Sequence, residues 1–163
     1  MNIFLLHLDP TKCAQYHADK HVVKMILETA QMLCAVHWRY GSPAPYKATH
    51  KNHPCTVWAG NTTTNYHFLH DLGIALCNEY TYRYNKTHKT ENILNTICTP
   101  PSELLATGLT DFVQAMPEEY KGTNAVEAYR TYYQQEKAYL CQWKNRPVPP
   151  FMQQAMLSVC ETT

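Results

Sequence analysis

Residues 17–36, HADKHVVKMILETAQMLCAV, carry the strongest structural signal in the chain. Side chains suited to a core recur along this stretch at three- and four-residue intervals: Val22, Ile26, Thr29, Leu33 and Val36. A polar stripe within about 80° lies on the opposite face. It consists of His17, His21, Lys24, Glu28 and Gln31. We therefore predict an amphipathic helix from about Thr11 to Tyr40.

Glycine and proline mark where this helix ends and where others begin. The sequence Gly-Ser-Pro-Ala-Pro at 41–45 ends the first helix. Three principal helices are expected near 11–40, 54–84 and 124–144, with short helices over 89–98 and at the C-terminus and a loop over 102–124. Gly60, Gly73 and the polar residues 61–65 weaken the second helix. No segment alternates as a strand does. We predict an all-α fold, a compact single domain over residues 1–163.

Composition narrows the possible functions. The 163 residues include 14 Lys and Arg against 13 Asp and Glu, a net charge of +1. A protein that scans duplex DNA is usually more basic, so any nucleic-acid role requires a local patch. Twelve Tyr and nine His supply rings and pH-sensitive groups for a compact anionic ligand.

The cysteines and the N-terminal sequence indicate the cellular compartment in which the protein is expected. Seven cysteines are spread along the chain with no C-x-x-C pair, which suits buried, reduced thiols. The start of the chain, MNIFLL, has no basic segment and too short an apolar run for a signal peptide. No stretch approaches the ~20 apolar residues of a membrane span. We expect a soluble, cytoplasmic protein with no membrane partner, located in the host cell if it is viral; the oligomeric state is left open.

The polar stripe of the first helix is the first candidate site. Glu28 can act as a general acid or base, and His21 lies on the same face as one wall of the site. A solvated helix face is the alternative interpretation. His17 and His21 have the i,i+4 spacing of metal ligands, and His50 and His53 follow on the next loop. Because no recognised metal motif supports them, we expect no metal and no cofactor, although a metal-dependent phosphohydrolase stays as an alternative.

Further ligand-binding residues are expected outside the catalytic pair. The basic loop Lys47–His53 supplies Lys51 and His53 as phosphate or base contacts. The segment Met116–Gly122 supplies Tyr120 and Lys121. The complete set of expected ligand-binding residues is His17, Lys24, Gln31, Lys51, His53, Trp58, Tyr120 and Lys121. Solvated loops are the alternative for both segments.

Three segments, in order, resemble the phage pyrimidine-dimer DNA glycosylases of the endonuclease V type. The string Ala-Asp-Lys-His at 18–21, followed after six residues by Glu28, resembles that family's A-D-x-H-x6-E pattern. The stretch from Tyr66 to Asn85 is similar to the family's long middle helix. Met-Pro-Glu-Glu-Tyr-Lys-Gly at 116–122 resembles its I-P-Q-E-F-R-G segment. The resemblance covers about two-thirds of the chain.

The resemblance implies a compact three-helix fold and a covalent mechanism. In that family the N-terminal α-amine attacks the N-glycosidic bond of a damaged thymine and forms a Schiff base. A glutamate of the first helix is the essential carboxylate. Carried over, Glu28 is the carboxylate, His21 a wall of the site and Met1 the source of the amine. Asn2 is a poor substrate for methionine removal, so we expect Met1 to be retained.

The chain departs from the family at its phosphate-binding arginines. Leu27, Gln31 and Ile3 stand where the family has arginine. We therefore expect weak or absent cleavage of duplex DNA carrying cyclobutane dimers, with recognition of a nucleotide or base retained. The partner is expected to be nucleic acid or a small nucleotide. The main alternative is a phage or viral protein that sequesters or cleaves a host nucleotide immune signal. Cleavage of the N-glycosidic bond of a damaged base would instead give the protein a role in DNA repair.

Overall fold

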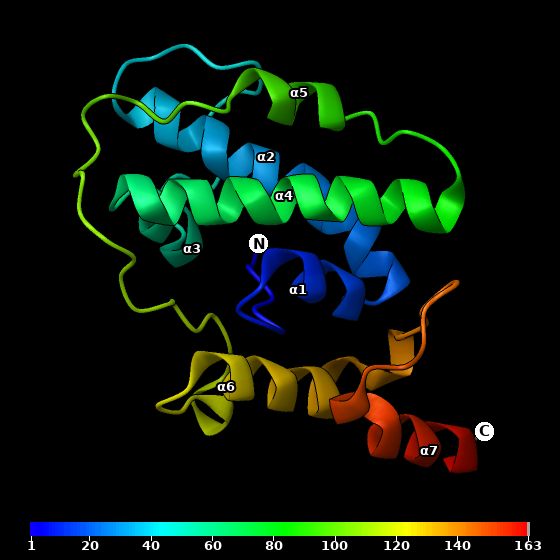
Figure 1. Cartoon of the computed structure of the whole chain (residues 1–163). Helices are drawn as coiled ribbons and strands as arrows, with labels where there is room; N and C mark the ends of the chain where they lie inside the picture. The colour runs from blue at the N-terminus through cyan, green and yellow to red at the C-terminus, as the bar shows by residue number, and fades with distance from the viewer. Residues whose placement is uncertain (163) are drawn as a thin grey trace.

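The computed structural model describes residues 1–162, and within them the fold is all-α, as the sequence predicts (Figure 1). The α-helices are α1 (Pro10–Tyr16), α2 (Asp19–Arg39), α3 (Pro54–Ala59), α4 (Thr63–Tyr84), α5 (Glu91–Thr96), α6 (Ala125–Tyr132) and α7 (Gln153–Thr162). The described residues contain no strand, only one isolated bridge between Thr62 and Leu105. None of the described helices is long and apolar enough to cross a membrane.

The predicted continuous helix over 11–40 is wrong at one point, where α1 ends and α2 begins. His17 and Ala18 have extended backbones, with ψ of 135° and 154°. Two tertiary hydrogen bonds hold this break: the Ala18 amide donates to the Tyr133 hydroxyl (3.1 Å), and the Asp19 amide donates to the Gln142 carbonyl (2.7 Å). Contacts more than 100 residues away in sequence therefore override the local helical pattern.

The other two long helices are also interrupted. The second divides at 60–62, where Thr62 accepts a hydrogen bond from the Asn65 amide and caps α4. The third leaves α-helical geometry after Tyr132 and continues as a π turn over Tyr133–Lys137 and a 3-10 turn over Ala138–Leu140. The expected short helix at 89–98 is α5, and the loop at 102–124 contains one 3-10 turn, Glu118–Tyr120.

The core forms where α2 packs against α4, with the N-terminal segment buried beside them. Gly73 allows the close approach, because a Cβ there would lie 2.9 Å from Cγ2 of Thr29 on α2. The side chains of Ile3–Leu6 are all buried. Figure 1 shows the N-terminus in the middle of the view, between α4 and α6. Arg130 on α6 donates to the Leu6 carbonyl (2.9 Å), so α6 covers this segment.

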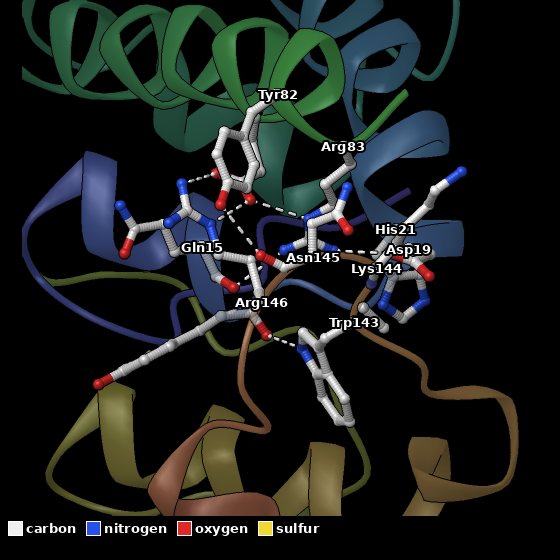
Figure 2. A network of polar contacts seen from close by, with 12 residues as sticks. Gln15, Asp19, His21, Tyr82, Arg83, Trp143, Lys144, Asn145 and Arg146 are labelled. Carbon is white, nitrogen blue, oxygen red and sulfur yellow. Dashed lines mark hydrogen bonds and ion pairs between the residues drawn. The ribbon is translucent and has the colours of Figure 1, made fainter. Parts of the chain in front are cut away.

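A buried network of charged side chains joins the C-terminal end of α4 to the N-terminal end of α2 (Figure 2). Arg83 of α4 has no exposed side-chain area and pairs with Glu79 (2.8 Å) and with Asp19 at the start of α2 (2.9 Å). Arg146 adds a bidentate pair to Glu79, at 2.9 and 3.1 Å. Since Arg146 comes from the segment after α6, the network ties the C-terminal third of the chain to α4.

Candidate functional site

The N-terminal amine and Glu28 form the centre of the candidate site. The Met1 nitrogen lies 3.2 Å from Oε1 of Glu28, and their side chains are only 3% and 9% exposed. Lys24, one turn before Glu28 on α2, places its Nζ 3.5 Å from Oε2, with a side chain that is 65% exposed. The carboxylate thus lies between the N-terminal amine and a solvent-facing ammonium group.

The Asn2 side chain holds the N-terminal segment in place. Its Oδ1 accepts hydrogen bonds from the Tyr129 hydroxyl (2.9 Å) and from the Ile3 amide (2.8 Å). Its Nδ2 donates to the Ala115 carbonyl (2.9 Å). Tyr129 also accepts from the Ala115 amide (3.1 Å) and is fully buried. The position of the amine is therefore fixed by α6 and the loop before it.

The Glu28 carboxylate has capacity for further interactions. Both of its oxygens are buried and neither has a hydrogen-bond partner among the described residues, so the contacts with Met1 and Lys24 are ionic only. A buried carboxylate normally accepts several hydrogen bonds. An unsaturated one can interact with a cationic or proton-donating group of a ligand.

Two side chains near this pair, His53 and Cys55, are neutral. Burial lowers the pKa of His53, and the nearby amine lowers it further. Burial raises the pKa of the Cys55 thiol to about 11. The His53 ring accepts a hydrogen bond from the Cys55 amide (3.1 Å) and so caps α3. The charges closest to the site are therefore those of Glu28, the amine and Lys24.

His21, which the sequence predicts as one wall of the site, packs in the core. It is 6% exposed and its ring stacks on Phe4 with centroids 4.4 Å apart. Its Nδ1 lies 2.5 Å from the Tyr133 hydroxyl. Burial lowers the pKa of His21 to about 3, so the ring is neutral and Nδ1 accepts from that hydroxyl. Neither His21 nor Glu28 lines any of the cavities described in the structure.

Two other expected ligand-binding residues also lie in the core. His17 is fully buried, with Nδ1 2.7 Å from the Cys13 carbonyl, and burial lowers its pKa to about 4. Trp58 is 3% exposed, stacks on Phe112 and donates to the Asp111 carbonyl (2.9 Å). These contacts give both side chains a structural role.

Tyr120 and Lys121 lie at the edge of an aromatic series that leads to His21. The Tyr120 hydroxyl donates to Glu136, and Lys121 pairs with Glu118 at 2.6 Å. The Tyr120 ring is 5.6 Å from that of Tyr132, which in turn is 6.4 Å from Phe4. Sequence reasoning missed Phe4 and Tyr132, because the turn that brings α6 onto the N-terminal segment leaves no local signal.

Gln31 lies on α2, whereas Lys51 lies on the loop that follows this helix. Gln31 is half-buried, one turn beyond Glu28. Lys51 lines a hollow of about 560 Å³ together with Trp38 and Arg39 from the end of α2. Arg39 donates to the Lys51 carbonyl and so holds the basic loop against the helix.

The histidines proposed as metal ligands do not converge. His17 and His21 bond to Cys13 and Tyr133, whereas His50 bonds to Thr49 and His53 caps α3. In the part of the chain that the structure describes, no group of three or more His, Cys, Asp or Glu side chains could hold a metal ion.

Comparison with known proteins identifies a family for the N-terminal part of the chain. The family model described as pyrimidine dimer DNA glycosylase matches residues 1–92, more than half of the chain. This region contains Met1, Lys24 and Glu28. No curated protein and no solved structure shows a significant match.

Proposed function

The chain belongs to the pyrimidine dimer DNA glycosylase family, and on this basis we propose that it cleaves an N-glycosidic bond in nucleic acid through Met1 and Glu28. The observation that supports the proposal is the 3.2 Å separation of the Met1 nitrogen and Oε1 of Glu28, whose side chain is only 9% exposed. A nucleophile and a carboxylate held in contact before substrate arrives need little reorganisation.

The chemistry follows from the two groups. The amine, which is protonated in its ionic contact with Glu28, first gives up a proton to solvent. Its lone pair then attacks C1′ of the target nucleotide, and the new N–C1′ bond forms as the bond from C1′ to the base breaks. The base leaves with that electron pair and takes up a proton. The attached amine then loses a proton and its lone pair forms the C1′=N bond of the Schiff base, while O4′ leaves with the electron pair of the C1′–O4′ bond and takes up a proton. The negative charge of Glu28 stabilises the cationic sugar during these steps.

Retention of Met1 is part of the proposal. Asn2 is occupied by its bonds to Tyr129 and Ala115, and the amine that faces Glu28 is that of Met1. Intact mass of the purified protein checks this directly. A mature protein that begins at Asn2 would remove the proposed nucleophile.

Borohydride trapping tests the activity. The wild-type protein is incubated with single-stranded and duplex oligonucleotides carrying a cyclobutane dimer, and the adduct is mapped by peptide mass. We expect an adduct on Met1, formed weakly on the duplex because Leu27 and Gln31 supply no cation. Glu28→Gln is expected to lower trapping at least about 100-fold. Glu103→Gln, which changes an exposed glutamate, is the matched control. An adduct on a lysine, or full trapping by Glu28→Gln, would contradict the mechanism.

A second candidate function is the capture of a small nucleotide. The near-neutral net charge favours it, as does Leu27, which is 41% exposed at a position where the resemblance expects an arginine. In a phage, such capture would remove or cleave a host nucleotide immune signal. Mass spectrometry of small molecules released on denaturation of the purified protein distinguishes this candidate from cleavage of nucleic acid.

A further inference from the structure

A basic groove lies beside the Glu28 site, between the exposed face of α2 and the loop that joins α4 to α5. Its volume is about 570 Å³. In Figure 1 this loop leaves the end of α4 and returns above it to α5. We propose that the groove binds a nucleotide of the substrate strand next to the target, an inference that rests on the proposed function.

The side chains of the groove suit the two halves of a nucleotide. Lys24, Lys86 and Lys89 supply three cations, and none of the ten lining residues is acidic. The α2 side of the groove is apolar, with Val23 and Leu27 40% and 41% exposed. Lysines neutralise backbone phosphates, and apolar surface accepts a base or sugar.

Two partly exposed tyrosines, Tyr46 and Tyr80, complete the lining. Base–aromatic stacking does not depend on sequence, since every base has a flat face. One nucleotide within a strand thus supplies a phosphate on each side for the lysines, and a ring for the tyrosines and the apolar surface. A purely acidic peptide would match the lysines and leave the aromatic and apolar surface unused.

The wall of the groove is held in place before any ligand binds. Asn85 ends α4 in the left-handed conformation, with φ of 56°, and turns the chain back over α2. The His88 ring then bridges to α2, with Nε2 3.1 Å from the Val23 carbonyl, while its Nδ1 accepts from the Thr90 amide (3.1 Å). The Tyr46 hydroxyl bonds to Thr90 (3.0 Å). Lys86 and Lys89 lie on this braced turn.

Lys24 joins the groove to the catalytic pair. It lines the groove, and its Nζ is 3.5 Å from Oε2 of Glu28. Leu27 lies in the groove and is the immediate neighbour of Glu28 in sequence. A strand with its target sugar at Glu28 therefore has an adjacent nucleotide within reach of the groove.

Binding of a fluorescein-labelled, single-stranded 12-mer DNA, followed by anisotropy across a salt series, tests the inference. Lys86→Gln/Lys89→Gln is expected to raise Kd at least about tenfold and to reduce the slope of log K against log salt by about 1.4, since each lost contact on a single strand removes about 0.7. The double variant Lys12→Gln/Lys144→Gln removes two exposed lysines outside the groove and serves as the charge-matched control. Unchanged binding by the groove variant, or an equal loss in the control, would overturn the proposal.

The same variants separate the groove from the glycosylase activity. All are made in wild type and in a Glu28→Gln background, where binding is read without cleavage. If wild type forms no trapped adduct but groove-dependent binding persists, the proposed function fails and the groove stands. If wild type forms the adduct and the groove variant binds DNA equally well, the groove fails and the function stands. Competition by free thymidine monophosphate as strong as that by the oligonucleotide would overturn the assignment to a strand.

Discussion

Two buried glutamates on neighbouring helices have opposite surroundings. Glu79 on α4 is 4% exposed and accepts three hydrogen bonds from Arg83 and Arg146. Glu28 on α2 is 7% exposed, and its oxygens have no hydrogen-bond partner within residues 1–162. Burial raises the pKa of Glu79, but the hydrogen bonds from the two arginines more than compensate and lower it below its ordinary value.

The difference separates a structural carboxylate from one suited to chemistry. The Glu79 network satisfies its charges internally, which stabilises the join between α4, α2 and the segment around Arg146. The Glu28 pair leaves hydrogen-bonding capacity unused in a buried place, which costs stability that a ligand can restore. The two carboxylates are similarly buried, and they differ in whether their oxygens accept hydrogen bonds.

Removing Arg83 is expected to have the largest effect on stability. Arg83→Met leaves Glu79 partly unpaired and Asp19 without its arginine, so the free energy of unfolding should fall by about 3–5 kcal/mol. Urea unfolding followed by circular dichroism measures it. Arg39→Met, which changes an exposed arginine, should cost less than about 1 kcal/mol. A comparable loss in both variants would mean that the network has no special stabilising role.

A pH series should show how the two buried histidines, His17 and His21, affect the stability of the fold. Beyond burial, His17 is influenced by Arg83 and Glu79, and His21 by His17, Lys137 and Lys24. Burial lowers their pKa values to about 4 and about 3, so the unfolded chain takes up protons first. Stability is full above about pH 6.5 and is lost as the pH falls from there towards 4, by about 1.4 kcal/mol per pH unit for each histidine.

Urea midpoints at pH 7, 6 and 5 check this dependence. By pH 5 each histidine should have removed about 2 kcal/mol of stability. His21→Gln should remove about half of the slope and leave the part due to His17. A midpoint that stays constant over this range would contradict the buried, neutral state of both rings.

Tyr129→Phe tests how rigidly the amine of Met1 is held. The change removes the hydroxyl bonded to Asn2, Val113 and Ala115, at a cost of about 1–2 kcal/mol. Because Asn2 then loses one anchor, adduct formation at Met1 should fall more than DNA binding does. Tyr139→Phe, at a 77% exposed tyrosine, is the control. Equal losses of binding and trapping would point to a general loss of folding instead.

The smallest effect on stability is expected for Lys24. Its contact with Glu28 is 3.5 Å and its side chain is 65% exposed, so Lys24→Gln should change the free energy of unfolding by less than about 0.5 kcal/mol. DNA affinity should nevertheless fall, since Lys24 lines the groove. A loss of stability above about 1.5 kcal/mol would show that Lys24, like Arg83, is structural.

The sequence predicted the helices better than their interruptions. Periodicity and proline located α2, α4, α5 and α6, because those signals are local. The break at Ala18 depends on Tyr133, a tertiary partner that no window of neighbouring residues contains. The break at Thr62, by contrast, has the local signal of Gly60 and the polar residues 61–65. The π turn after Tyr132, like the break at Ala18, has no signal in the neighbouring residues.

The candidate site could be predicted only along α2. Helical spacing placed Lys24 and Glu28 on one face, and the family resemblance suggested the amine. The polar stripe also contained His17 and His21, which the structure buries against Cys13 and Tyr133. Helical spacing alone could not distinguish a face open to solvent from one covered by α6 and the N-terminal segment.

The bonds that complete the N-terminal half have a consequence for how the protein folds. Asn2 bonds to Tyr129 and Tyr16 to Trp143, each pair separated by 127 residues. Contacts this distant in sequence slow folding, because a long loop must close before they form. A chain still being synthesised cannot position its first residues until the last third has emerged. Residues 1–92 alone, although they carry the family match, would lack α6 and Arg146 and would not form the site.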